Sequence, residues 1–165
     1  MASGRLYLAI GGCEGTADEK KAKDAKCMDA NSLMLQCENA WTVQDRSGAS
    51  RGTCTGMFAR FWVNKNTTAI VMNALRGDAI KGVGYQIFDN NHKLLMSVEL
   101  VNARVLSVSC GGDGSGNTFC ECRFGGRVLK VDCGDNKKDE HNFAEPKAGA
   151  TDDKPIGDAM KAVSW

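Results

Sequence analysis

Hydrophobic and polar residues alternate with a period of two over much of the chain after residue 54. This pattern is typical of β-strands that bury one face and expose the other. Polar clusters rich in asparagine, aspartate and glycine interrupt it at the spacing of turns in an all-β domain. The pattern predicts strands at residues 56–63, 67–75, 82–88, 93–101, 103–110, 117–124 and 127–133.

Three polar clusters are predicted to close hairpins between these strands. They are residues 64–66, residues 89–91 and the pair Gly125-Gly126, which is the shortest predicted loop. Strands joined in this way form an antiparallel meander or sandwich and not a parallel sheet. One choice of buried strand face gives the expected core, which consists of Phe61, Val63, Ile70, Met72, Ile87, Leu95, Val98, Val105, Val108, Leu129 and Val131.

The first part of the chain has a different pattern. Residues 5–10 predict a first strand that ends at Gly11-Gly12. Thr16 and Glu19 then have the spacing of a capping box, and an alanine- and lysine-rich stretch follows. We therefore expect a helix near residues 17–28. The predicted fold class is α+β to mainly β: an antiparallel sheet or sandwich with an N-terminal helix, stapled by disulfides.

The length of 165 residues predicts one domain, residues 1–165, with enough material for a hydrophobic core. Residues 134–154 are polar and predict an irregular surface segment. From Pro155 onward either a short helix forms, with Ile156, Met160 and Val163 on one face, or the end is frayed. Residues 134–165 are thus a polar C-terminal extension that packs on the domain or trails from it.

Cysteine is unusually frequent, and the count of eight is even. This usage is typical of a small secreted domain, so we expect four disulfides and no free thiol, with the connectivity left open. The alternative is a cytosolic chain whose cysteines are reduced or bind metal. The predicted disulfide cysteines are Cys13, Cys27, Cys37, Cys54, Cys110, Cys120, Cys122 and Cys133.

Charge and hydropathy exclude several classes of protein. The chain has 21 basic and 20 acidic residues, whereas a nucleic-acid-binding protein has a surplus of basic residues. No apolar run is long enough for a membrane span. Residues 1–5 also lack the apolar core of a signal peptide, so secretion requires that an export signal was removed and a short remnant put in its place.

The spacing of the last cysteines bears on a metal site. Cys120 and Cys122 lie two residues apart in a predicted strand and share a face, so each is expected to bridge to a different partner. A zinc site would use Cys110 and Cys133 as the other two ligands. Structural zinc sites normally use cysteines separated by two to four residues, and we therefore expect no metal and no cofactor.

No catalytic motif is present in the sequence. His92 lies in a predicted turn and His141 in the polar extension, and neither has a neighbour that would make it a general base. Gly82 and Gly84 open a strand, whereas a dinucleotide site requires a helix there. We expect no enzyme activity. The alternative is a secreted hydrolase or ligand-binding protein whose site is lined by carboxylates, for which the candidates are Asp78, Asp89, Glu99 and Glu121.

Two short motifs indicate surface functions. Arg76-Gly77-Asp78 lies between two predicted strands and would form the tip of a hairpin that binds a receptor, or an ordinary turn. Asn66-Thr67-Thr68 is an N-glycosylation sequon beside a predicted turn, which suits an exposed loop of a secreted protein.

In size, cysteine content, predicted strands and absence of a catalytic motif, the chain resembles the small secreted cysteine-rich effectors of plant-pathogenic fungi. Residues 58–88 resemble the ToxA group in their two predicted strands, their Arg76-Gly77-Asp78 loop and the following Tyr85-x-x-Phe88-Asp89. A helix beside a disulfide-laced antiparallel sheet is also similar to the LARS effectors.

This resemblance implies a virulence or avirulence effector that binds a host protein or immune receptor without catalysis. It would be extracellular, in the plant apoplast, with uptake by host cells as a further possibility. No nucleic-acid partner is expected, and the sequence does not define the oligomeric state.

Overall fold

The computed structural model describes residues 4–39, 52–134 and 138–142. Strands dominate this part of the chain, and every strand pairing in it is antiparallel, as the alternating pattern predicts. The elements are β1 (Arg5–Ile10), α1 (Lys20–Asp24), β2 (Cys27–Asp29), β3 (Ser32–Asn39), β4 (Gly52–Trp62), α2 (Thr67–Arg76), β5 (Ala79–Phe88), β6 (Leu94–Gly112), β7 (Thr118–Gly125), β8 (Val128–Asp132) and β9 (Lys138–Asn142).

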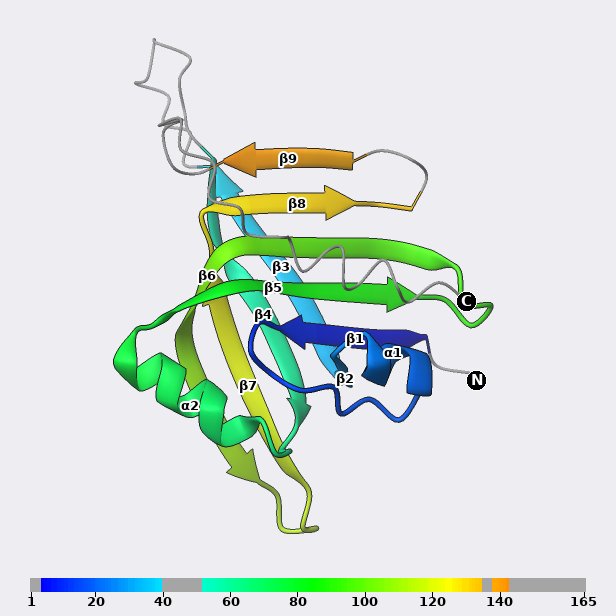
Figure 1. Ribbon diagram of the computed structural model, residues 1–165, viewed down its shortest axis with the longest axis vertical. Helices are drawn as coiled ribbons and strands as arrows, with labels where there is room; N and C mark the ends of the chain where they lie inside the picture. Colours follow the sequence, from blue (N-terminus) through cyan, green and yellow to red (C-terminus); the bar gives the residue numbers. More distant parts are fainter. Residues whose placement is uncertain (1–3, 40–51, 135–137, 143–165) are drawn as a thin grey trace.

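The strands form one curved sheet in the order β2-β1-β5-β6-β7-β4-β3 (Figure 1). The corner between β2 and β3 joins the two ends of this order. The backbone N–H of Ala30 donates to the carbonyl of Leu6 in β1 (2.9 Å), and the N–H of Asn31 donates to the carbonyl of Arg60 in β4 (2.7 Å). The corner therefore links β1 to β4, and the sheet curves round on itself.

The N-terminal helix is much shorter than the sequence predicts. Only Lys20–Asp24 is helical, and Glu19, in place of Thr16, precedes the first turn without a side-chain capping bond. The reason is that Cys27–Asp29 pairs with β1 as β2, so the predicted helix is interrupted by a strand. The strand predicted at residues 5–10 is confirmed as β1.

The strand predicted at residues 67–75 is wrong, because this segment is helix α2. Its threonine, isoleucine and valine favour strands, but Ile70 and Ala74 lie one helical turn apart and pack against the core. Gly77 ends the helix in the left-handed conformation (φ 68°), a common signal for a helix C-terminus. The turn at residues 64–66 therefore leads into a helix and does not close a hairpin.

The two later turns differ in outcome. Residues 89–91 do close a hairpin, because β5 and β6 pair along their length. The pair Gly125-Gly126 does not, since β7 and β8 are not paired with each other. Both pair with β6, β8 with residues 97–101 and β7 with residues 104–112. A single long β6 replaces the two strands predicted on either side of Asn102, whose φ is 49°.

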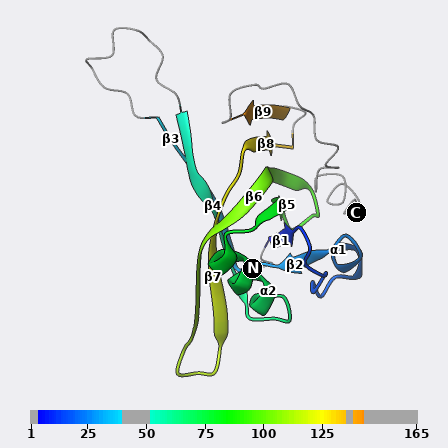
Figure 2. The same cartoon turned by 60° about the vertical axis from the view of Figure 1, so that its left-hand side comes forward.

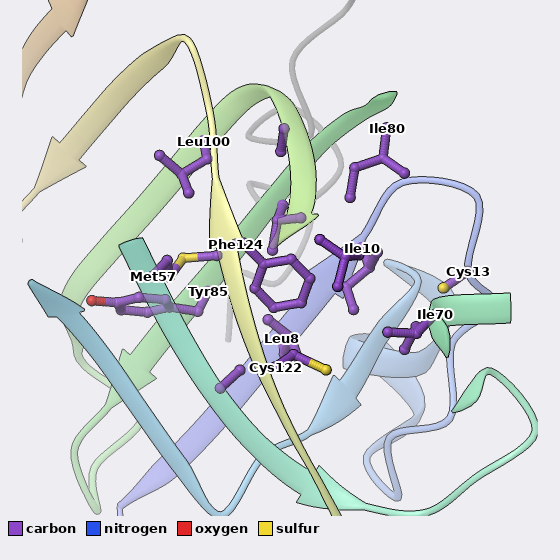
Figure 3. Close-up of a cluster of buried hydrophobic side chains, with 14 of the residues drawn as sticks. Leu8, Ile10, Cys13, Met57, Ile70, Ile80, Tyr85, Leu100, Cys122 and Phe124 are labelled. Atoms are coloured by element: carbon purple, nitrogen blue, oxygen red, sulfur yellow. The ribbon is translucent and has the colours of Figure 1, made fainter. Parts of the chain in front are cut away.

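The core fills the space enclosed by the sheet (Figure 3), and Leu8, Tyr85 and Phe124 are almost fully buried in it. A smaller cluster lies outside the sheet, where alanines of α1 and the preceding loop pack with Tyr7 and Phe88. Of the predicted core, Phe61, Ile70, Val98, Val105 and Leu129 are buried, and Ile87, Val108 and Val131 are partly buried against it. Three predictions are wrong: Val63, Met72 and Leu95 are 42%, 37% and 46% exposed.

The C-terminal extension is described only in part. Residues 138–142 form β9, which pairs with β8, so an irregular structure is the wrong prediction there. The helix predicted from Pro155 lies outside the described residues. Neither of the helices in the described residues has the length and apolar content that crossing a membrane requires.

Candidate functional site

The structure joins two of the eight cysteines. Cys110 of β6 lies directly opposite Cys120 of β7, and the two form a disulfide with their Cα atoms 4.3 Å apart. Cys120 is therefore not bonded to Cys122, as predicted, but the expected second bridge from Cys122 is not formed. Cys13, Cys27, Cys122 and Cys133 are thiols, so the structure differs from the expectation of a fully bridged set.

The buried thiols are separated by the fold. Cys13 and Cys122 belong to the main core, whereas Cys27 belongs to the outer cluster beside α1. Burial raises the pKa of both Cys27 and Cys122 to about 12, because the apolar surroundings disfavour the thiolate. These cysteines are therefore poor nucleophiles at neutral pH.

The alternative zinc site is not assembled. Cys110 and Cys120 are bonded to each other, and Cys133 lies exposed after β8. Within residues 4–39, 52–134 and 138–142, no group of three histidine, cysteine or acidic residues is close enough to hold a metal ion. His92 lies in the β5–β6 turn with φ 60°, and His141 lies in β9.

The Arg76-Gly77-Asp78 tripeptide is exposed, but it is not the tip of a hairpin. Arg76 is the last residue of α2, and Asp78 precedes β5. The tripeptide therefore connects a helix to a strand, because the residues before it form α2 and not the predicted strand. Its role in binding stays a prediction.

Asn66 does not lie in the exposed loop that the sequon suggests. It is 6% exposed, and its side-chain amide donates to the carbonyl of Glu14 (2.8 Å) and accepts from the N–H of Glu14 (3.1 Å). These two bonds hold the start of α2 against the loop after β1. Glycosylation would require the same amide nitrogen, so the folded structure disfavours this predicted modification.

The four candidate carboxylates do not form a site. Asp78 and Asp89 flank opposite ends of β5, which places them roughly 35 Å apart along the strand. Glu99 is buried in β6, and Glu121 lies on the outer surface of β7, where it is 3.6 Å from Arg60. The prediction of a carboxylate-lined hydrolase site is therefore wrong. Glycosidase chemistry requires two carboxyl groups within about 10 Å of each other.

The structure instead reveals a shallow groove on the outer surface of β3, β4, β6 and β7. Its volume is about 380 Å³. Two rows of directly opposed residues cross these strands in the same order, β3, β4, β7 and β6. The first row is Ser32, Arg60, Glu121 and Ser109, and the second is Met34, Phe58, Arg123 and Ser107. With strands about 4.8 Å apart, each row spans about 14 Å.

Aromatic rings position the two arginines of the groove. The guanidinium of Arg60 lies over the ring of Phe119 at 4.1 Å, and that of Arg123 lies 5.6 Å from the ring of Phe58. Met34 is 50% exposed at the side of the groove formed by β3. Glu121 is the single carboxylate among the lining residues, all of which the structure describes. The groove therefore suits contact with another protein and offers no pair of groups for acid–base catalysis.

Sequence reasoning missed most of this groove. Of the residues that line it, only Glu121 and Cys122 were candidates from the sequence, the first as a hydrolase carboxylate and the second as a disulfide cysteine. The assembly of the lining residues depends on the register of β4 against β7, which joins parts of the chain far apart in sequence.

Comparison with solved structures identifies the fold. Hcp1 from Salmonella typhimurium matches with a TM-score of 0.73 and 17% identity, over 87% of this chain and 96% of that chain. A type six secretion system protein matches with a TM-score of 0.69 and 12% identity, over 78% and 83%. The secreted protein Hcp3 from Pseudomonas aeruginosa matches with a TM-score of 0.65 and 9% identity, over 86% and 99%. No protein-family model and no curated protein matches the sequence.

These matches show that the fungal effector interpretation is wrong. The structural neighbours are bacterial Hcp-type proteins, and they support neither a plant-pathogen toxin nor a host receptor as partner. The reason for the error is physical. Small size, strands and many cysteines are common to unrelated domains, and the second strand of the ToxA-like stretch is helix α2.

Proposed function

We propose that this chain is an Hcp-type secreted protein of a bacterial type VI secretion system, and that it acts through protein contacts without catalysis. The observation that carries the proposal is the match to Salmonella Hcp1 over 87% of this chain and 96% of that one. Agreement over nearly the whole of both chains means that the common structure is not one local motif. The identity of 17% supports a shared fold, and the function is our inference from it.

The outer groove is the contact surface that we assign to this function. It combines guanidinium groups, exposed apolar area at Met34 and serine hydroxyls, a mixture common at protein interfaces. The groove lies on paired strands, so its side chains are held in place before a partner binds. Such preorganisation reduces the entropy lost on binding.

Secretion is tested by expressing the tagged chain in a bacterium with an active type VI system and in an isogenic strain whose system is inactivated. We expect the protein in the culture supernatant of the first strain alone, with a cytoplasmic reporter absent from both supernatants. Equal amounts in both supernatants would contradict the proposal, because release would then not depend on the secretion system.

The groove is tested separately with Arg123→Ala, and Arg127→Ala is the matched control. Arg127 is exposed and follows the β7–β8 turn, outside the groove. We expect the first variant to be exported several-fold less than the second, with both folded by circular dichroism. Equal export would exclude the groove as the contact surface and leave the secretion result unaffected.

A further inference from the structure

The disulfide between Cys110 and Cys120 lies directly behind one end of the outer groove. The two cysteines are register partners in β6 and β7, and the next pair along these strands is Ser109 with Glu121, which both line the groove. Phe119, whose ring positions an arginine of the groove, precedes Cys120 in β7. Adjacent residues of a strand point to opposite faces, so the bond joins the two strands from the core side.

The part of β6 that borders the groove has few other contacts to hold it. Residues 105–112 pair with β7 along one edge, and no other strand of the described chain pairs with their second edge. Of residues 106–112, only Val108 is not fully exposed, and Gly111 and Gly112 have no side chain to pack. Figure 2 shows the closed end of the β6–β7 hairpin extending beyond α2 and the other strands at the bottom of the view. Segments with so few buried side chains open locally at a low free energy.

From this arrangement we infer that the Cys110–Cys120 bond is a redox-sensitive clamp, which holds residues 106–112 of β6 against β7 and so fixes one side of the groove. The inference rests on the proposed function, which assigns the groove as the contact surface, and it adds a means of regulating that surface. With the bond intact, Ser107 and Ser109 are held in place before a partner binds. Reduction permits local opening, and the entropy lost on binding a partner then increases.

The bond is accessible to a reductant from one side. Cys110 is exposed, whereas Cys120 is 0% exposed, so a thiolate reaches the sulfur of Cys110 first. With dithiothreitol as the reductant, its thiolate attacks the Cys110 sulfur, and Cys120 leaves as a thiolate that takes up a proton. The second thiol of dithiothreitol then displaces Cys110 from the mixed disulfide. Two protein thiols form, and one dithiothreitol is oxidised to its cyclic disulfide.

The inference is tested by hydrogen–deuterium exchange of the full purified chain before and after treatment with dithiothreitol. We expect the amide exchange of residues 106–112 to become roughly tenfold faster after reduction, because the bond no longer restricts local opening. Strand β5 is the internal control, since it pairs with β1 along one edge and with β6 along the other. Its exchange should stay unchanged, which shows that the sheet remains folded.

The state of the bond is measured in the same samples by alkylation with N-ethylmaleimide in denaturant and digestion with trypsin. Cleavage after Arg104 and Arg123 places Cys110, Cys120 and Cys122 in one peptide, 105–123. We expect the label on Cys122 alone before reduction and on all cysteines of this peptide afterwards. A bond that dithiothreitol does not reduce in the folded protein would overturn the inference.

Two variants complete the test. Cys110→Ser should show the fast exchange of residues 106–112 without reductant and no further change on addition of dithiothreitol. Cys133→Ser, which removes another exposed cysteine outside the groove, should respond to dithiothreitol as the wild type does. Unchanged exchange of residues 106–112 in the reduced wild-type protein would also overturn the inference. Export by the type VI system is measured separately, so failure of the clamp and failure of the proposed function give different results.

Discussion

Replacing Asn66 with alanine should destabilise the domain, because this side chain joins two parts of the fold. The substitution removes the 2.8 Å and 3.1 Å hydrogen bonds to the backbone of Glu14. Both bonds are partly buried, and unsatisfied buried groups cost about 1–3 kcal/mol each. We expect the free energy of unfolding to fall by roughly 2–4 kcal/mol. At a urea dependence of about 2 kcal/mol per M, the unfolding midpoint falls by about 1–2 M.

Thr68→Ala is the matched control for this substitution. Thr68 is exposed, so its replacement abolishes the same glycosylation sequon and leaves the Asn66 amide in place. Urea unfolding followed by circular dichroism should give a stability within about 0.5 kcal/mol of the wild type. If Asn66→Ala were as stable as Thr68→Ala, the bonds to Glu14 would not hold α2 to the loop after β1, and our explanation would be refuted.

Three further predictions concern neighbouring features. Phe61 is fully buried and Trp62 is 50% exposed, so Phe61→Ala should cost about 3–5 kcal/mol in urea unfolding and Trp62→Ala clearly less. Equal losses would show that the wrong face of β4 has been assigned to the core. A Cβ atom added at either Gly77 or Gly114 would meet no atom within 4 Å, but only Gly77 has a positive φ, of 68°. Gly77→Ala should therefore cost about 1 kcal/mol through backbone strain, and Gly114→Ala should be neutral. Equal thermal midpoints of the two variants would contradict this. Because burial raises the pKa of Cys122 from 9.0 to about 12, the stability that its protonated thiol contributes is present below pH 9 and is lost as the pH rises towards 12. Alkylation of Cys122 at pH 8 should therefore be far slower in the folded protein than in urea, and equal rates would show that this thiol is not buried.

The amino-acid sequence by itself determined much of the local strand structure after residue 54. The pattern predicted β1, strands within β4, β7 and β8, and the β5–β6 hairpin, because side chains on a strand point alternately to its two faces. It did not predict β2 and β3, the two strands at the ends of the sheet order. Of the eleven core positions that we predicted from it, five are buried and three are partly buried against the core. The groove that contains Arg60 and Arg123 was not predictable from it.

Tertiary structure alone decided the remaining features. Residues 67–76 contain strand-favouring side chains, but a helix allows Ile70 to pack into the core. Gly125-Gly126 has the composition of a hairpin turn, yet β8 pairs with β6 because β7 already occupies the other part of that strand's edge. The two rows of the groove require a register between strands. Register depends on the packing of whole strands against one another, so residues adjacent in sequence do not determine it.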